Sequence, residues 1–336
     1  MRRIPSSACL GLLLAALSPL SLGQAEVEAQ AEDWQLKRMP WGDPDLQGTW
    51  TSATVTTLYR PEELENLVLT ETEAAAVEQF GAERLEEIDD VGEGDLEAGA
   101  SVGGYNSFWV DPGTRVLRVN GEPRSSIIVE PEDGQIPYTL WGRAQFYWKG
   151  YNFINRRDNP EERPLGERCT VGFGSTGGPP MLPVLYNNNY QFVQSPDTVL
   201  ILVEMNHNAR SVRLDGETLP PNMKPWLGDS VGRWEGDTLV VTTTQFHPQQ
   251  DLRAAIKHQL FMGEDTVVTE RFTRVAEQEI LYQFTVSDDS LYRQDWKGEM
   301  TLRHTDAQIY EYACHEGNYA MPNILSGARQ EEQGGE

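Results

Sequence analysis

Short runs rich in β-branched and aromatic residues, separated by clusters of glycine, proline, aspartate and asparagine, fill the chain from Tyr105 onward. The alternation is clearest where Ile280, Tyr282, Phe284 and Val286 share one face, as expected of a strand with one buried side. The expected strands are residues 126–129, 144–147, 190–194, 198–205, 238–246, 266–274, 280–286, 300–303 and 309–314. Because no helical pattern separates these runs, the sequence predicts a mainly β fold with an antiparallel barrel-like or sandwich domain.

The first residues have the pattern of a secretory signal. Arg2 and Arg3 precede an apolar run over residues 10–17, and small residues stand at the −3 and −1 positions of a cleavage site after Ala25. The adjacent arginines leave the Sec and twin-arginine routes both open. No later run reaches the roughly 18 apolar residues of a membrane-spanning helix, so no membrane insertion is expected. The sequence predicts a periplasmic or secreted protein.

The region between the signal and the β-rich part has a pattern of its own. A turn over residues 41–50 leads into a strand to about Leu58, and the capping box of Thr70 and Glu73 predicts a helix to about Glu87. Eight carboxylates between residues 83 and 97 indicate a solvated linker. We therefore expect a signal peptide (1–25), an N-terminal extension (26–100), a β-rich domain (101–330) and a disordered tail (331–336).

Two cysteines remain after the predicted cleavage. Cys169 and Cys314 form an even pair in a chain expected to reach an oxidising compartment, which favours a disulfide between them. Two buried free thiols are the alternative, because spacing in sequence does not show that the Cα atoms come within reach.

The charge balance is strongly acidic, with 27 Lys and Arg against 52 Asp and Glu and a formal net charge of −25. Such a chain has no general attraction for phosphate backbones or anionic lipid, which rules against nucleic-acid and membrane-surface partners. Residues 172–177 match G-x-G-x-x-G, but Gly178-Pro179-Pro180 follows where a dinucleotide site needs a helix. We therefore expect no nicotinamide cofactor, and the sequence indicates no other cofactor.

Several stretches resemble known proteins. Residues 227–241 (LGDSVGRWEGDTLVV) and 310–321 (YEYACHEGNYAM), with 186–189 and 204–213, resemble a large group of exported bacterial proteins of unknown function. This resemblance covers about residues 40–330 and implies export and β architecture, without a reaction. Gly48-Thr49-Trp50 before a strand is similar to the G-x-W entry of lipocalins, which implies a lipocalin- or calycin-like barrel that holds a ligand.

The candidate catalytic and binding residues lie near the ends of two predicted strands. His207 follows one of them and is trailed by Arg210 and Arg213, while Tyr312, His315 and Glu316 lie at the end of the last. Imidazole is the side chain whose ordinary pKa lies near neutrality, so the histidines are candidates for proton transfer and the arginines for holding an anionic oxygen. Asn188 and Trp234, within the motifs above, are further candidates for substrate contact. The alternative for both histidines is a structural role, in which each only hydrogen-bonds a loop to the sheet.

A more specific hypothesis for the same residues is a metal site built from His207, His315 and Glu316. No standard ligand spacing supports it, and we expect no metal. We expect these three residues, Arg210 and Tyr312 to converge on one concavity at the mouth of the sheet. The leading hypothesis is a cofactor-independent enzyme, a lyase or isomerase, that performs acid–base chemistry on a small, largely apolar organic substrate. A non-catalytic carrier on the same scaffold and a carbohydrate-active lyase or hydrolase are the alternatives. The sequence leaves the oligomeric state open.

Overall fold

The computed structural model describes residues 34–89, 110, 112–172, 174–255 and 258–334. Contacts divide the chain between Gln35 and Leu36, and the fold below is that of Leu36–Glu336. The predicted signal peptide and most of the acidic linker lie outside the described residues, so the structure does not bear on them.

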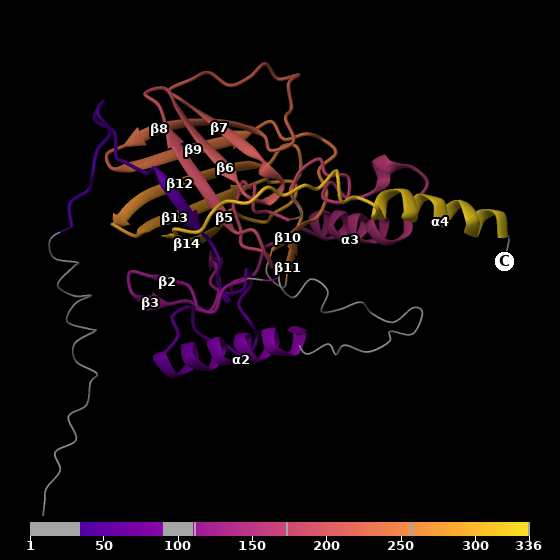
Figure 1. Cartoon of the computed structure of the whole chain (residues 1–336), viewed down its shortest axis with the longest axis horizontal. Coiled ribbons are helices and arrows are strands. Elements are labelled where there is room, and N and C mark those ends of the chain that lie inside the picture. The colour runs from indigo at the N-terminus through magenta and orange to yellow at the C-terminus, as the bar shows by residue number, and fades with distance from the viewer. Residues whose placement is uncertain (1–33, 90–109, 111, 173, 256–257, 335–336) are drawn as a thin grey trace, which may run out of the picture. The chain divides into compact units, whose positions relative to one another are not determined.

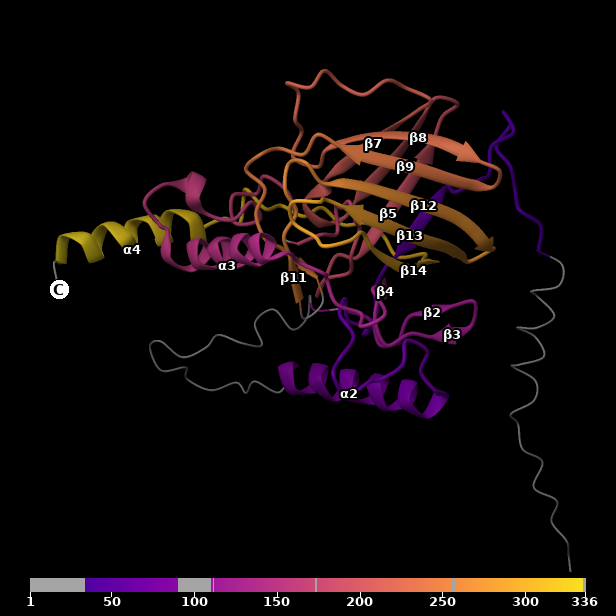
Figure 2. The same cartoon turned by 180° about the vertical axis from the view of Figure 1, so that it is seen from behind.

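Nine strands close into a barrel in the described part of the chain (Figure 1 and, from behind, Figure 2). Neighbouring strands pair in antiparallel fashion except β7 and β8, which are parallel. The barrel closes where β1 pairs with β14, through Trp50 opposite His304 and Thr51 opposite Arg303. In order around the barrel, the strands are β1 (Gly48–Thr51), β5 (Asn189–Gln194), β6 (Thr198–Val203), β7 (Ala209–Leu214), β8 (Asp229–Glu235), β9 (Thr238–Thr244), β12 (Val267–Ala276), β13 (Glu279–Ser287) and β14 (Trp296–His304). The predicted mainly β, barrel-like fold is confirmed.

The inside of the barrel is a packed core. Strand alternation sends every second side chain inward, as in β13, where Ile280, Tyr282, Phe284 and Val286 are all buried. Large aromatic side chains fill the interior and have almost no exposed surface: Trp50, Tyr190, Phe192, Phe272, Tyr282, Phe284 and Trp296. A ligand therefore has to be sought at the wall or the ends of the barrel, because side chains occupy its centre.

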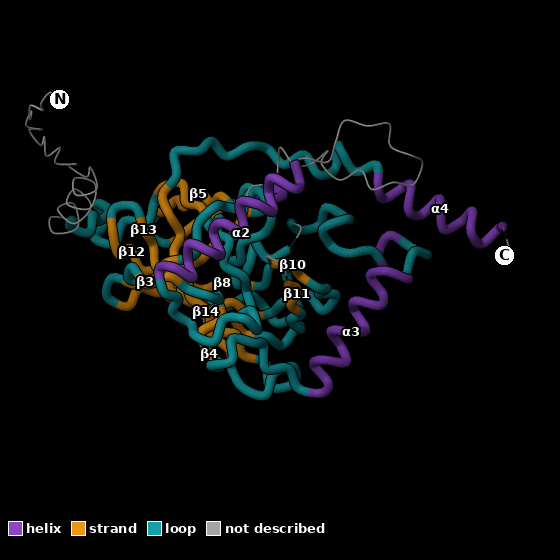
Figure 3. Tube along the Cα trace, turned by 90° about the horizontal axis from the view of Figure 1, so that it is seen from below, coloured by secondary structure: helices purple, strands orange, loops and turns teal. Residues whose placement is uncertain are grey.

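Shorter elements and helices surround the barrel. Strand β4 (Ile128–Glu130) pairs with β14, while β2 (Arg118–Val119) with β3 (Glu122–Pro123) and β10 (Arg253–Ala255) with β11 (His258–Leu260) form two small hairpins. Figure 3 shows the helices α2 (Glu71–Asp89), α3 (Leu140–Asn155) and α4 (Ala320–Gly334) outside the strands. Two 3-10 turns, η2 (Pro160–Glu162) and η3 (Met205–His207), complete the elements.

The predicted start of α2 is confirmed in detail. The Thr70 amide donates to Glu73 Oε2 (2.8 Å) and the Glu73 amide donates back to Thr70 Oγ1 (3.2 Å), which is the reciprocal pair of a capping box. α4 continues the chain in helical form as far as Gly334, four residues into the stretch for which the sequence predicts a disordered tail.

Two expected strands are wrong. Residues 144–147 lie inside α3, whose N-cap Thr139 accepts a hydrogen bond from the Gly142 amide (2.9 Å). Residues 309–314 form no strand. β14 already pairs with β13 on one side and with β1 and β4 on the other, so the chain after His304 cannot pair beside it.

Candidate functional site

The barrel wall opens between β7 and β8. These two strands pair only through Arg213 opposite Val231 and Leu214 opposite Gly232, so their first residues have no partner across the gap. A parallel pair requires the chain to return to the start of the sheet, and residues 215–228 make that return over the outside. The result is a cleft in the wall between two strands rather than a mouth at the end of the barrel.

A cavity of about 360 Å³ occupies this cleft, within the size range of small-molecule sites. It is lined by the first half of β7, the start of β8, the returning loop and two residues that follow Cys169: Thr170, Val171, Asn208, Ala209, Arg210, Ser211, Arg213, Leu219, Pro225, Trp226, Leu227, Gly228, Asp229 and Ser230. We call this the β7–β8 cleft. Its lining combines two guanidinium groups with one carboxylate.

Arg210 forms the inner end of the cleft. Alternation along β7 points it inward, and its side chain is 1% exposed. Its Nη1 and Nη2 donate to the two carboxylate oxygens of Glu270, at 3.1 and 2.5 Å, and Nη2 also reaches Ser230 Oγ at 3.5 Å. Arg210 Nε has no hydrogen-bond partner among the described residues. One buried donor of this guanidinium is therefore left over beside the cavity.

The ion pair of Arg210 and Glu270 governs protonation around it. Burial alone would lower the pKa of Arg210, but the charge and hydrogen bonds of Glu270 outweigh burial and raise it. The Tyr282 hydroxyl donates to Glu270 Oε1 (2.8 Å), and burial together with the negative charge of Glu270 raises the pKa of Tyr282. Arg210 therefore remains a cation and Tyr282 a neutral donor at physiological pH.

Arg213 lies nearer the solvent, with 33% of its side chain exposed. It pairs with the buried Asp229 at 2.9 Å and also donates to the Glu217 carbonyl. Asp229 Oδ2 accepts a further hydrogen bond from the Leu219 amide (2.8 Å), which fastens the returning loop to β8. The outer guanidinium is thus held in place by a carboxylate while part of it faces water.

The loop wall carries an aromatic ring. Trp226 stacks on His247 with ring centroids 3.8 Å apart, and its carbonyl accepts a hydrogen bond from Gln250. Gly228 follows in a left-handed conformation (φ +73°), where a Cβ would lie 2.7 Å from Thr243 Cγ2. The glycine is required both by the backbone angle and by close packing of the loop against β9.

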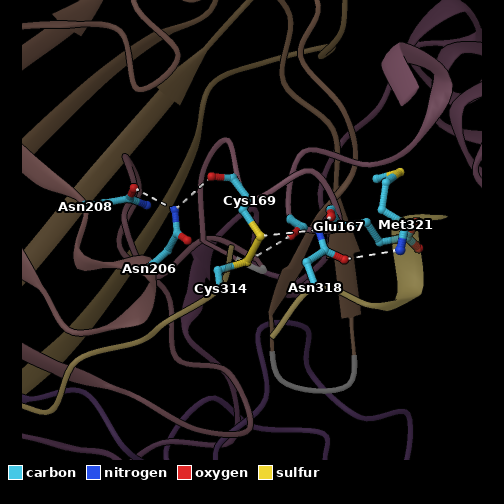
Figure 4. Close-up of a disulfide and its surroundings, with 8 residues drawn as sticks. Glu167, Cys169, Asn206, Asn208, Cys314, Asn318 and Met321 are labelled. Atoms are coloured by element: carbon cyan, nitrogen blue, oxygen red, sulfur yellow. Dashed lines mark hydrogen bonds between the residues drawn. A yellow bond between two sulfur atoms is a disulfide. The ribbon is translucent and has the colours of Figure 1, made fainter. Parts of the chain in front are cut away.

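The predicted disulfide between Cys169 and Cys314 is confirmed, with Cα atoms 5.7 Å apart (Figure 4). Asn206 Nδ2 reaches the Cys169 carbonyl (3.5 Å), and Asn318 Nδ2 donates to the Glu167 carbonyl (2.6 Å). The turn after β6, the loop around Cys169 and the segment after Cys314 therefore meet at one place. Thr170 and Val171 line the cleft and directly follow Cys169 in the chain, so the disulfide holds the segment that forms this part of the cleft.

The structure places the predicted site residues in three groups. Arg210 and Arg213 both line the β7–β8 cleft. His207 is exposed and immediately precedes the lining residue Asn208, while His315 and Glu316 are exposed in the turn after the disulfide. Their expected convergence with Arg210 on one concavity is not seen, because none of these three residues lines the cleft. Their catalytic role stays a prediction.

The other three predicted residues lie apart from the cleft. The ring of Tyr312 stacks on Tyr186, with centroids 6.5 Å apart. Asn188 is buried and braces the backbone of Val184 through its amide group, accepting from Val184 N and donating to Val184 O at 2.8 Å each. Trp234 lies near the far end of β8, five residues after Asp229.

The sequence did not reveal several residues that line the cleft or that bond to Arg210 behind it. Glu270 occupies an inward position between Val268 and Phe272. The sequence does show a glutamate at a position of the expected strand where the alternation calls for an apolar residue, and this could have identified it. The alternation predicts that Tyr282 faces the core, but it does not indicate the hydrogen bond from its hydroxyl to Glu270. Ser230 and Trp226 gave no sign of their role, since it depends on where the returning loop lies.

Over the part of the chain that the structure describes, no group of three or more histidine, cysteine, aspartate or glutamate side chains is placed to hold a metal ion, and His207, His315 and Glu316 do not form one. No described helix is both long and apolar enough to cross a membrane. A second, smaller cavity of about 230 Å³ lies between α3 and the loops that contain Arg163 and Gln249.

Comparison of the chain with protein-family models, with curated proteins and with solved structures found no match in any of the three.

Proposed function

We propose that this protein is exported and binds a small organic acid in the β7–β8 cleft. The observation that carries the proposal is Arg213, a lining residue with 33% of its side chain exposed, and Asp229 is the one carboxylate among the lining residues. Arg210 also lines the cavity, but its guanidinium is buried and paired with Glu270. In a chain of net charge −25, a partly exposed guanidinium at a cavity marks a site for an anion.

The chemistry of the lining suits a carboxylate attached to an apolar body. The forked donors of a guanidinium match the two oxygens of a carboxylate, and Arg213 is the lining arginine that water reaches, with 33% of its side chain exposed. Trp226, Leu219, Pro225 and Leu227 supply apolar surface on the loop side for the rest of the ligand. A binding site in the barrel wall is also consistent with the packed interior, because side chains already fill the centre of the barrel.

Export is supported by the disulfide. Cys169 and Cys314 are bonded, and such bonds persist in oxidising compartments such as a periplasm or the extracellular space. The charged start, apolar run and small-residue cleavage site of residues 1–25 point in the same direction.

Acid–base chemistry on the bound molecule is the second candidate function. It is favoured by the turn between β6 and β7, where Asn206 and His207 both have positive φ (58° and 42°) directly before the lining residue Asn208. Strained conformations of this kind cluster at functional sites. In this scheme His207 and His315 exchange protons with the substrate, and Tyr312 and Glu316 assist them.

Binding is tested by titrating the purified protein with benzoate and a set of other small carboxylates, each beside its uncharged amide. We expect the acids to bind at least about tenfold more tightly than the amides, because an uncharged amide cannot form the charge-assisted hydrogen bonds that a carboxylate forms with a guanidinium. Arg213→Gln should remove most of this preference, and Arg213→Lys, which keeps the charge but not the fork, should retain part of it.

Arg233→Gln is the matched control, because Arg233 lies on β8 with 54% of its side chain exposed and away from the cleft. Equal binding of acids and amides, or equal effects of the Arg213 and Arg233 variants, would reject the proposal. Consumption of a bound acid by the wild type but not by His207→Ala, with binding unchanged, would favour the second function.

A further inference from the structure

Helix α3 shows an aromatic face to water. A helix on the surface of a globular protein normally packs its apolar face inward and shows its polar face to water. In α3 the side that faces solvent consists largely of aromatic and aliphatic residues, although the packed side already contains Phe146 and Phe153 beside a lysine and two glycines. Folding alone does not account for this arrangement, because burying the aromatic face against the barrel would stabilise the protein more.

The packed side of α3 is fixed by specific contacts. Gly142 lies so close to the chain that an added Cβ would overlap the Leu291 carbonyl. Lys149 donates to the Gln250 carbonyl and lies over the Phe261 ring, 5.6 Å from its centroid, and burial lowers its pKa. Phe146 contacts Tyr138 at 5.8 Å between ring centroids. These contacts set the rotation of the helix, so its aromatic side cannot turn inward.

The outward side carries five large apolar residues with high exposure. Leu140 is 90% exposed, Trp141 60%, Tyr147 70%, Trp148 53% and Tyr151 59%. At about 200 Å² for each side chain, they present roughly 660 Å² to solvent. An exposed apolar patch of that size marks a surface that contacts something. We call these five residues the α3 aromatic face.

The charge around this face differs from the rest of the chain. Residues 134–157 contain no aspartate or glutamate, whereas Arg143, Lys149, Arg156 and Arg157 lie within them. Arg156 pairs with Glu162 (3.6 Å) and Arg157 with Glu331 (3.5 Å), which leaves Arg143 as the cation exposed beside the face. Charges farther away than about 10 Å are largely screened at physiological salt, so the chain-wide excess of acid does not govern contacts here. The sequence-based argument against membrane surfaces therefore does not extend to this face.

We propose that the α3 aromatic face binds the surface of a zwitterionic phospholipid bilayer. Tryptophan and tyrosine are enriched at membrane–water interfaces because their rings are apolar with a polar edge. A helix with such a face lies in the plane of the interface, and arginines beside it suit the phosphates of the headgroups. α3 has this composition over Leu140–Asn155, and Arg143 is exposed next to the face.

A second copy of the chain fits the face less well. A stable interface buries about 600–1,000 Å² on each partner, so the roughly 660 Å² of the face would reach only the lower end of that range even if all of it were covered. A bilayer surface, in contrast, can accommodate the whole length of the helix.

The test is flotation of the full-length protein with phosphatidylcholine vesicles. We expect wild type to float with the vesicles and Trp141→Ser/Trp148→Ser to bind at least about tenfold more weakly, since each tryptophan contributes buried apolar area. Tyr310→Ser/Tyr319→Ser is the matched control, because these aromatic residues are 63% and 74% exposed but lie outside α3, and it should float like wild type. Vesicles of brominated phosphatidylcholine should quench tryptophan emission of wild type and less of the tryptophan double variant.

Failure of wild type to float, or equal flotation of the two double variants, would overturn the proposal. A dimer of wild type in sedimentation velocity without vesicles, abolished by Trp141→Ser/Trp148→Ser, would overturn it in favour of a second copy. Circular dichroism of each variant establishes that it is folded before its flotation is compared.

Discussion

Replacing Glu270 by glutamine removes the charge that compensates Arg210 inside the barrel. Both side chains are almost fully buried, at 0% and 1% exposed, and two hydrogen bonds join them. A glutamine keeps the size of the side chain but leaves the guanidinium without a counter-charge in a region that water does not reach. Breaking a buried pair in this way costs about 3–5 kcal/mol of folding free energy. We expect a loss in this range for Glu270→Gln.

The same reasoning predicts that removing both charges is less harmful than removing one. In Arg210→Met/Glu270→Leu no buried charge is left unpaired, so the double variant should recover most of the loss. Arg271→Gln is the control, because Arg271 is the next residue of β12 but points outward and is 41% exposed, and we expect no measurable loss from it.

Urea unfolding followed by tryptophan fluorescence measures these free energies. A Glu270→Gln variant that loses less than about 1 kcal/mol would refute the claim that Arg210 depends on Glu270 as its buried counter-charge. A double variant at least as unstable as Glu270→Gln would refute it too, because the loss would then come from packing rather than from an unpaired charge.

Three further predictions follow from local contacts. Cys169→Ala/Cys314→Ala should lose about 2–5 kcal/mol of stability and weaken carboxylate binding, and a variant that melts and binds like wild type would contradict the role of the disulfide. Gly228→Ala should cost about 1–3 kcal/mol in urea unfolding, because a Cβ there overlaps Thr243, whereas Gly236→Ala, with nothing within 4 Å, should cost less; equal costs would contradict the packing argument. Stability should fall as the pH rises above about 10, because burial raises the pKa of four tyrosines and the unfolded chain gives up these protons first. Their ultraviolet ionisation signal should appear only together with unfolding, and its appearance in the folded protein would contradict their burial. These tyrosines are Tyr138, Tyr190, Tyr282 and Tyr292.

The barrel could be predicted because its strands alternate regularly. Residues 280–286 show the burial that their pattern indicates, with every second side chain inside. α3 could not be recognised in the same way. Its aromatic residues, Phe146 and Tyr147 among them, favour strands, and the reading of a pattern assumes that apolar residues face the core. In α3 that assumption fails, since the aromatic side faces out.

The candidate site could be predicted only in part, because its position depends on a single parallel pairing. Arg210 and Arg213 were identified from their place after an apolar strand, and both line the cleft. The cleft itself exists because β7 and β8 run in parallel and separate before Arg213, and sequence spacing does not reveal the direction of a pairing. Glu270 is sixty residues from Arg210 along the chain, so no local pattern connects the two.

A crystal structure of the protein grown with 4-bromobenzoate would test the central claim most directly, because the anomalous signal of bromine locates the ligand without ambiguity. We expect one bromine peak in the β7–β8 cleft on the Trp226 side, with the carboxylate hydrogen-bonded to Arg213 or Arg210. A bromine peak only in the smaller cavity beside α3, or none in the cleft while the ligand is bound in solution, would contradict the account.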